Sequence, residues 1–217
     1  MSIFRLSLSV SALLVVAAPA LAQDVSVSAG VSLLTEYESN GTRQSDGPAV
    51  QGYIQADLDG FYAGIWASNV DPVILGGDRL EYDLYLGYAN TVGMFSYDLG
   101  YARYYYNDSG FCCGDVIFSG EMALSDAISV GARFSSDPDG FDVINSRLYG
   151  SLSLTDAVSM DARYGDISGE DGHSYWSVGI NHAVSEASAV FASFHGTSIE
   201  DEDNLFLAGV SIDFSLR

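Results

Sequence analysis

Lysine is absent from this chain of 217 residues, and its arginines are far outnumbered by 29 aspartates and glutamates, so the formal net charge is −21. Because binding to nucleic acid depends on basic patches that neutralise phosphates, this composition excludes nucleic acid as a partner. Cysteine is nearly absent too: Cys112 and Cys113 are adjacent, and there are no others. Without further thiol or imidazole ligands nearby, they predict neither a metal site nor a bound cofactor.

A long apolar run is missing after the N-terminus. Residues 6–18 are apolar, follow the basic residue Arg5 and precede Ala20-Leu21-Ala22, the small-residue pattern of a signal-peptide cleavage site. An uncleaved membrane helix is the alternative, but this run is too short to span a bilayer comfortably. The sequence therefore predicts a cleavable signal peptide over 1–22. Because nothing in the remainder resembles a linker, it also predicts a single domain over 23–217.

The rest of the chain consists of short segments in which apolar and polar residues alternate. In 50–58 the apolar residues recur at every second position, the period of a strand with one apolar face. Asp59-Gly60 suits a tight hairpin turn, and the alternation resumes at Phe61. About twelve such segments, joined by alternately short and long links, predict an all-β fold: a transmembrane, antiparallel, up-and-down β-barrel.

An internal repeat fixes the direction of three of these strands. Residues 124–134 and 154–164 align, and 184–194 is a weaker third copy at the same spacing of about thirty residues. One repeat equals one hairpin, a short turn plus a longer loop. The three strands must therefore run the same way, with Arg133 and Arg163 on one face and the aromatic residue that ends each copy on the other.

Aromatic residues gather near both ends of the apolar face. They are Phe134, Tyr164, Trp176, Phe194 and Phe206 near the longer links, and Phe61, Tyr88, Phe95 and Phe214 near the short turns. The two interfaces of a membrane select such aromatic girdles. A soluble β-sandwich would explain the alternation equally well, but it would explain neither the girdles nor the alternating link lengths.

The opposite face carries charged side chains and is predicted to line the barrel interior. The predicted pore-lining residues are Asp57, Glu81, Asp83, Asp98, Glu121, Arg133, Arg147, Asp161, Arg163 and Asp213. Barrels of about eight strands are filled by side chains, whereas those of roughly sixteen or more enclose a channel. A thin, charge-lined pore and a plugged interior therefore both remain open. In a pore, the excess of acid predicts a preference for cations.

Carboxylates also cluster in the longer links, within 137–142, 166–171 and 200–203. Two interpretations stand: a solvated outer rim, or a site for divalent cations, which prefer carboxylate oxygens. Cys112 and Cys113 fall in a predicted loop from Asn107 to Asp115, where export favours their oxidation, either to each other or to another chain.

Catalytic motifs are lacking. The nucleophile elbow G-x-S-x-G does not occur in the sequence. Ser193 and Ser198 lie close to His195, but the sequence assigns no third residue that would orient this histidine. It therefore predicts no enzymatic activity.

Motifs in the first half of the chain resemble the TorF-type porin family of proteobacteria. They are Thr35-Glu-Tyr, Asn40-Gly-Thr-Arg-Gln-Ser-Asp-Gly-Pro-Ala-Val-Gln51, Gly60-Phe-Tyr-Ala-Gly-Ile-Trp-Ala-Ser-Asn-Val70 and Glu81-Tyr-Asp-Leu-Tyr-Leu-Gly87. The resemblance extends over most of the first half and implies an outer-membrane barrel of the porin type. It implies little about the solute.

The second of these motifs would form the first outer loop. Gly41 and Gly47 permit a tight fold, and Arg43, Gln44 and Asp46 are predicted to tuck into the mouth and constrict it. An ordinary surface loop is the alternative.

Together these patterns predict a barrel in the outer membrane of a Gram-negative bacterium, surrounded by outer-membrane lipid, that passes small hydrophilic solutes passively. The alternative is a non-conducting barrel whose acidic outer loops serve binding, adhesion or envelope structure. The sequence leaves the solute and the oligomeric state open.

Overall fold

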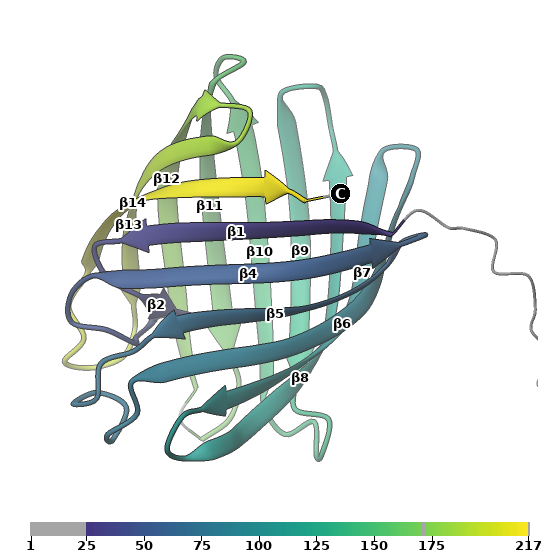
Figure 1. Ribbon diagram of the computed structural model, residues 1–217. Helices are drawn as coiled ribbons and strands as arrows, with labels where there is room; N and C mark the ends of the chain where they lie inside the picture. Colours follow the sequence, from purple (N-terminus) through teal and green to yellow (C-terminus); the bar gives the residue numbers. More distant parts are fainter. Residues whose placement is uncertain (1–24, 171, 217) are drawn as a thin grey trace, which may run out of the picture.

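The computed structural model describes residues 25–170 and 172–216, so the predicted signal peptide, 1–22, lies outside the described residues. Twelve antiparallel strands form a closed barrel, and β1 pairs with β14 to complete it (Figure 1). The barrel strands are β1 (Ser26–Leu34), β4 (Ala49–Leu58), β5 (Phe61–Asn69), β6 (Leu80–Val92), β7 (Phe95–Tyr106), β8 (Gly110–Ala123), β9 (Ile128–Ser136), β10 (Ile144–Ser153), β11 (Val158–Ile167), β12 (His173–Ser185), β13 (Ser188–Thr197) and β14 (Leu205–Ser215). The predicted fold class is confirmed.

Local sequence accounts for the turns at one end of the barrel. Asp59 and Gly60 both have positive φ, 49° and 87°, as a two-residue hairpin turn between twisted strands requires. In the three repeat copies, the same hydroxyl position closes the turn. Ser125, Thr155 and Ser185 each accept a hydrogen bond from the backbone N–H two residues later. The predicted common direction of β9, β11 and β13 is confirmed, because all three begin after such a turn.

The barrel is apolar outside and polar inside. Large hydrophobic side chains are exposed on its outer surface along nearly every strand, and buried hydrophobic residues are few. The predicted aromatic bands lie on this surface. Trp176 packs against Phe194 near the longer links, and Phe61 packs against Tyr88 near the short turns. Exposed apolar strands with aromatic residues near both ends suit a surface that contacts lipid. No helix in the described residues is long and apolar enough to cross a membrane.

Arg103 is a charged side chain on the apolar face. β7 continues to Tyr106, and the residue opposite Arg103 on β6 is the exposed Leu84. The Arg103 guanidinium lies 4.0 Å from the centroid of the Phe111 ring. Arginine can place its planar group on an aromatic face in this way near a membrane interface.

The predicted loop from Asn107 to Asp115 is wrong. β7 and β8 are joined by a tight turn at 107–109, and β8 already begins at Gly110. Cys112 and Cys113 therefore lie in a strand, joined to each other by a disulfide, beside a register shift between Tyr104 and Tyr105. A β-bulge accommodates an extra residue without ending the pairing, and for this reason the strand passes through a segment with a loop-like composition.

The link between β1 and β4 carries a small hairpin of its own. β2 (Glu38–Ser39) pairs with β3 (Thr42–Arg43), separately from the barrel sheet. Its contacts lie inside the barrel.

Candidate functional site

The β2–β3 hairpin touches opposite walls of the barrel interior. On the wall formed by strands from the first half of the chain, the ring of Tyr37 lies 5.6 Å from that of Trp66 on β5. Burial, together with the charge and hydrogen bond of Glu81 on β6, raises the pKa of the Tyr37 hydroxyl. Tyr37 therefore stays neutral and anchors the hairpin to this wall.

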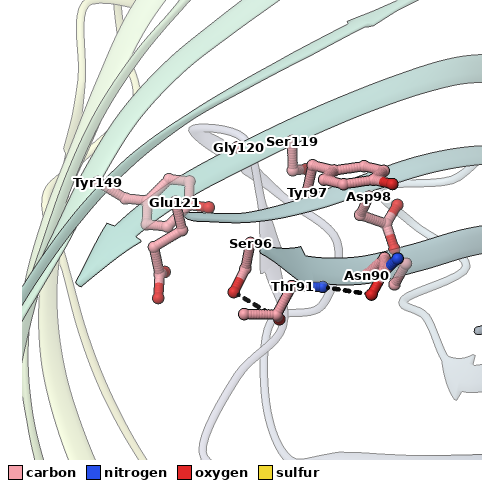
Figure 2. A pocket seen from close by; sticks show the side chains of 10 residues that line it. Asn90, Thr91, Ser96, Tyr97, Asp98, Ser119, Gly120, Glu121 and Tyr149 are labelled. Carbon is pink, nitrogen blue, oxygen red and sulfur yellow. Dashed lines mark hydrogen bonds between the residues drawn. The ribbon is translucent and has the colours of Figure 1, made fainter. Parts of the chain in front are cut away.

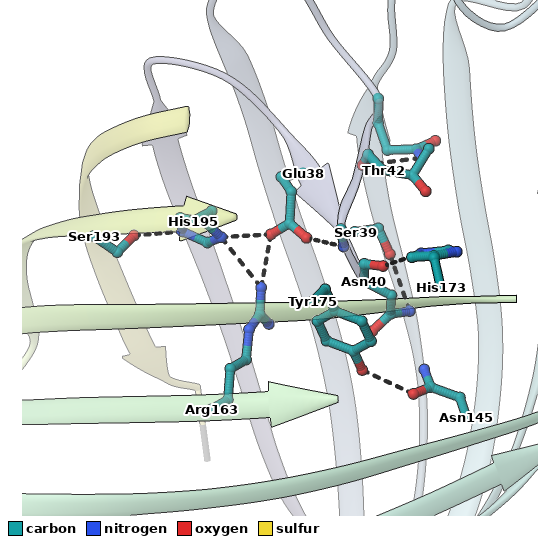
Figure 3. Close-up of polar contacts among 12 residues, drawn as sticks. Glu38, Ser39, Asn40, Thr42, Asn145, Arg163, His173, Tyr175, Ser193 and His195 are labelled. Carbon is teal, nitrogen blue, oxygen red and sulfur yellow. Dashed lines mark hydrogen bonds and ion pairs between the residues drawn. The ribbon is translucent and has the colours of Figure 1, made fainter. Parts of the chain in front are cut away.

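The next residue, Glu38, reaches the opposite wall. Its carboxylate lies 2.6 Å from Nη2 of Arg163 on β11 and 2.7 Å from Nδ1 of His195 on β13 (Figure 3). The Glu38 side chain is only 6% exposed. Burial alone would raise the pKa of this carboxyl group, but the hydrogen bond to His195 and the charge of Arg163 outweigh it and hold the pKa below its ordinary value. The hairpin is thus fixed by a buried, ionised carboxylate.

The tip of the hairpin is anchored beside this contact. The carbonyl of Asn40 lies 2.8 Å from Nε2 of His173, at the start of β12 (Figure 3). Gly41 has a φ of 87° and packs so closely on Tyr175 and Thr197 that an added Cβ would lie 2.7 Å from the Cβ of Tyr175. The tip therefore requires glycine both for its backbone conformation and for its close approach to the wall.

The predicted constriction residues lie in the same link, but none of them makes the contact with the far wall. Arg43 pairs at 3.6 Å with Glu36 and with Asp46, both within the link. Gln44 donates its backbone N–H to the carbonyl of Tyr37. These residues stabilise the link through contacts within it, while Tyr37 and Glu38 attach it to opposite walls of the barrel interior.

Ser193 and His195, considered above for catalysis, do form a polar chain with an acid. The hydroxyl of Ser193 lies 2.7 Å from Nε2 of His195, whose Nδ1 faces Glu38 (Figure 3). The short contact to Glu38 favours the tautomer with the proton on Nδ1. The missing orienting group is therefore Glu38. Ser193 lies within β13, paired on both sides with β12 and β14, so its backbone offers no obvious oxyanion hole.

Three cavities whose linings include charged and hydroxyl side chains adjoin one another in the interior, since Ser119 lines all three. The largest, of about 770 Å³, is lined by residues including Asp57, Asp98 and Arg133. The second, of about 390 Å³, lies along β8 to β11. The third, of about 370 Å³, lies near the β6–β7 turn and includes Glu121 and Tyr149 (Figure 2). The interior is therefore hollow on the turn side of the hairpin.

The structure brings most of the predicted pore-lining residues to these cavities. Asp57 and Asp98 line the first; Glu121, Arg133, Arg147, Asp161 and Arg163 line the second. Neutral donors hold several of the acids: Tyr62 donates to Asp98, Tyr53 to Asp213 and Asn181 to Asp161. Glu81 is buried on β6, where it interacts with Asp83 and with Tyr37. Among the described residues, Arg163 alone of the three arginines is in an ion pair with a carboxylate.

Glu38 was not predicted as a site residue, and neither Tyr37 nor His195 was predicted to make contacts inside the barrel. Glu38 lies in a link that reads as a polar loop, and its partners follow more than a hundred positions later. The one available signal was the alternation of side chains along a strand. His195 lies two residues after Ser193, so the two side chains share the inner face.

Acidic side chains also gather at the mouth. Asp46, Asp71 and 201–203 line a cavity of about 370 Å³ together with Arg43. In the part of the chain that the structure describes, no three acidic, histidine or cysteine side chains are grouped closely enough to hold a metal ion. Divalent-cation binding at the rim stays a prediction.

Several solved structures share this fold. The KdgM porin matches with a TM-score of 0.67 at 12% identity, covering 86% of this chain and 99% of that chain. KdgM in complex with disordered oligogalacturonate matches with a TM-score of 0.63 at 10% identity, covering 87% and 99%. An outer-membrane channel from Pseudomonas putida F1 matches with a TM-score of 0.56 at 11% identity, covering 92% and 99%. At these identities the likeness concerns the fold.

No curated protein matches the chain in sequence. A family model does, over residues 18–211, and its description is "Bacterial protein of unknown function (Gcw_chp)". This match covers most of the 217 residues, so the chain belongs to the Gcw_chp family of bacterial proteins.

Proposed function

We propose that the protein is an outer-membrane channel for the passive diffusion of small hydrophilic solutes. The observation that carries this proposal is the set of adjoining cavities, lined in part by charged and hydroxyl side chains, inside a barrel with an apolar outer surface. A barrel that served only as a scaffold would gain stability from filling this volume with packed side chains. The resemblance to TorF-type porins and the porin fold of the structural neighbours are consistent with the proposal.

We further propose that small inorganic ions pass with a preference for cations. The ten predicted pore-lining residues comprise seven carboxylates and three arginines, and Glu38 pairs with one of these arginines. An excess of fixed negative charge raises the local concentration of cations and lowers that of anions. The hairpin narrows the path and brings solutes close to these charges.

The experiment is conductance in planar bilayers, followed by swelling of liposomes in neutral sugars of graded size. We expect discrete channel currents, a reversal potential on the cation-selective side in a salt gradient, and a sharp size limit in swelling. Absence of both current and swelling, for protein whose barrel is shown to be folded, would support the alternative of a non-conducting barrel with binding or adhesive loops. Anion selectivity would contradict the cation preference alone.

One observation favours a second candidate, hydrolysis of an ester or amide inside the barrel. Ser193, His195 and Glu38 follow the order of a nucleophile, a base and an orienting acid. Two features count against it. Arg163 binds the same Glu38 oxygen as His195, so this carboxylate is shared between two partners and is not dedicated to orienting the histidine. The paired backbone around Ser193 leaves the oxyanion without evident donors.

A further inference from the structure

Two arginines lie directly opposite each other on the interior wall. Arg133 on β9 is the cross-strand partner of Arg147 on β10, and Arg163 follows on β11. Like charges directly opposite on neighbouring strands are destabilising, so this arrangement needs a compensating partner.

The described residues supply no direct ion-pair partner for the first two. Within the described residues, no ion pair joins Arg133 or Arg147 to a carboxylate, whereas Arg163 is held by Glu38 at 2.6 Å. Arg147 is only partly exposed, and a half-buried guanidinium without an acceptor carries a desolvation cost. An anion from solution would offset this cost.

The cavity of about 390 Å³ in front of these arginines is large enough for a small solute. Its lining combines the three arginines with four hydroxyl groups, those of Ser119, Ser129, Ser151 and Tyr149, and with two carboxylates, Glu121 and Asp161. The arginines offer paired N–H donors that match the two oxygens of a carboxylate. The hydroxyls and the two acids are acceptors for hydroxyl groups of a ligand, and the Tyr149 ring offers an apolar surface.

We infer that this cavity binds a sugar acid, a hydroxylated ring with one carboxylate, with the carboxylate on Arg133 and Arg147 and the ring hydroxyls toward Glu121 and the serines. The inference rests on the proposed channel and names a solute class for it. The two acids in the lining disfavour a doubly charged anion such as phosphate, because they add repulsion to each additional negative charge. They do not disfavour sugar hydroxyls, which donate to carboxylates.

The test measures block of single-channel current in the full-length protein by glucuronate, with glucose, acetate and inorganic phosphate as comparison solutes. Glucuronate is expected to reduce the current saturably, at concentrations where the other three have little effect. In the double variant Arg133→Ser with Arg147→Ser, the half-blocking concentration should rise by at least about tenfold, since two charge-assisted contacts are lost. Arg79→Ser removes an exposed arginine from the 70–79 link and is the matched control; it should leave the block unchanged.

A conservative variant keeps the test valid if the double serine variant fails to assemble. Arg133→Lys with Arg147→Lys retains both charges but loses the planar fork, so block should weaken by a few-fold only. Equal block in the wild type and both double variants would overturn the inference. So would block by acetate or phosphate at concentrations equal to those of glucuronate.

Failure of the channel itself is distinguishable from failure of this site. If no current is seen, calorimetric titration of glucuronate into the detergent-solubilised, folded barrel still reports on the cavity. Binding that the double serine variant abolishes would then support the site while contradicting the channel. Absence of binding in wild-type protein would overturn the site.

Discussion

Glu38 and Arg163 are 125 positions apart in sequence, yet the Glu38 carboxylate accepts a hydrogen bond from the Arg163 guanidinium at 2.6 Å inside the barrel. The contact joins the link between β1 and β4 to strand β11, on the opposite wall of the barrel. Because Tyr37, the preceding residue, contacts the near wall, the link is held at two opposite points. A link fixed at both walls cannot move out of the interior without breaking one of these two contacts.

We expect Glu38→Gln to loosen the hairpin. The amide retains the size of the side chain but loses the charge that pairs with Arg163, and the loss of a charge-assisted hydrogen bond costs about 1.5–3 kcal/mol. The hairpin should then open more often, so single-channel conductance should rise and trypsin should cleave faster after Arg43, which is half-buried in the folded link.

Glu36→Gln is the matched control for this change, since Glu36 pairs with Arg43 inside the link and not with the barrel wall. It should alter conductance less than Glu38→Gln does. Equal conductance and equal cleavage in all three proteins would show that Glu38 does not restrain the hairpin.

Acidification should release the same contact. The Glu38 pKa is depressed in the folded state, so its ionised form stabilises the hairpin above its ordinary carboxyl pKa of 4.5, and this contribution is lost as the pH falls through the lower, folded value. Conductance should therefore be steady at neutral pH and rise once the pH falls below about 4.5. In Glu38→Gln this pH-dependent rise should be much smaller; an unchanged pH profile in the variant would assign the effect to other carboxylates.

Most of the fold could be predicted from local sequence patterns. The period of two in β4, the Asp59-Gly60 turn and the repeated hydroxyl turn before β9 are all written in neighbouring residues, so they were predictable. The disulfide-bearing part of β8 was not, because a bulge hides the alternation. The candidate site was predictable only in part. Parity alone places Arg163 on the inner face, but nothing near Glu38 in sequence indicates that its link folds inward to meet that arginine.

Ser193→Ala decides between anchoring and catalysis. If the serine only donates to His195, the variant should keep channel conductance within a small margin, and neither protein should hydrolyse short-chain p-nitrophenyl esters above the buffer rate. The loss of one neutral hydrogen bond costs about 0.5–1.5 kcal/mol, too little to prevent assembly. Ester hydrolysis by the wild type that disappears in Ser193→Ala, with an intact barrel, would instead establish the second candidate function.

A charge on the outer surface should impair assembly, whereas the same charge on the interior face should not. Leu148, near the middle of β10, is 65% exposed on the apolar surface, and Ser151 on the same strand lines an interior cavity. Leu148→Arg should cost about 2–4 kcal/mol in lipid, and Ser151→Arg far less. The measurement is the fraction of protein with heat-modifiable gel mobility after folding into vesicles. Similar fractions for both variants would mean that the apolar surface does not face lipid.

The carboxylates on the first-half wall should set the ion preference. Asp98 accepts a hydrogen bond from Tyr62 at 2.9 Å, and Asp57 accepts one from Gln55 at 2.8 Å, so asparagine at both positions keeps an acceptor oxygen while removing the charge. Reversal potentials in a salt gradient should then move toward anion selectivity, because both carboxylates that line the largest cavity have lost their negative charge. Asp139→Asn with Asp142→Asn, in the 137–143 link, removes the same two charges at the rim and is the control. A shift of equal size in this control would assign selectivity to the overall charge of the loops rather than to the cavity wall.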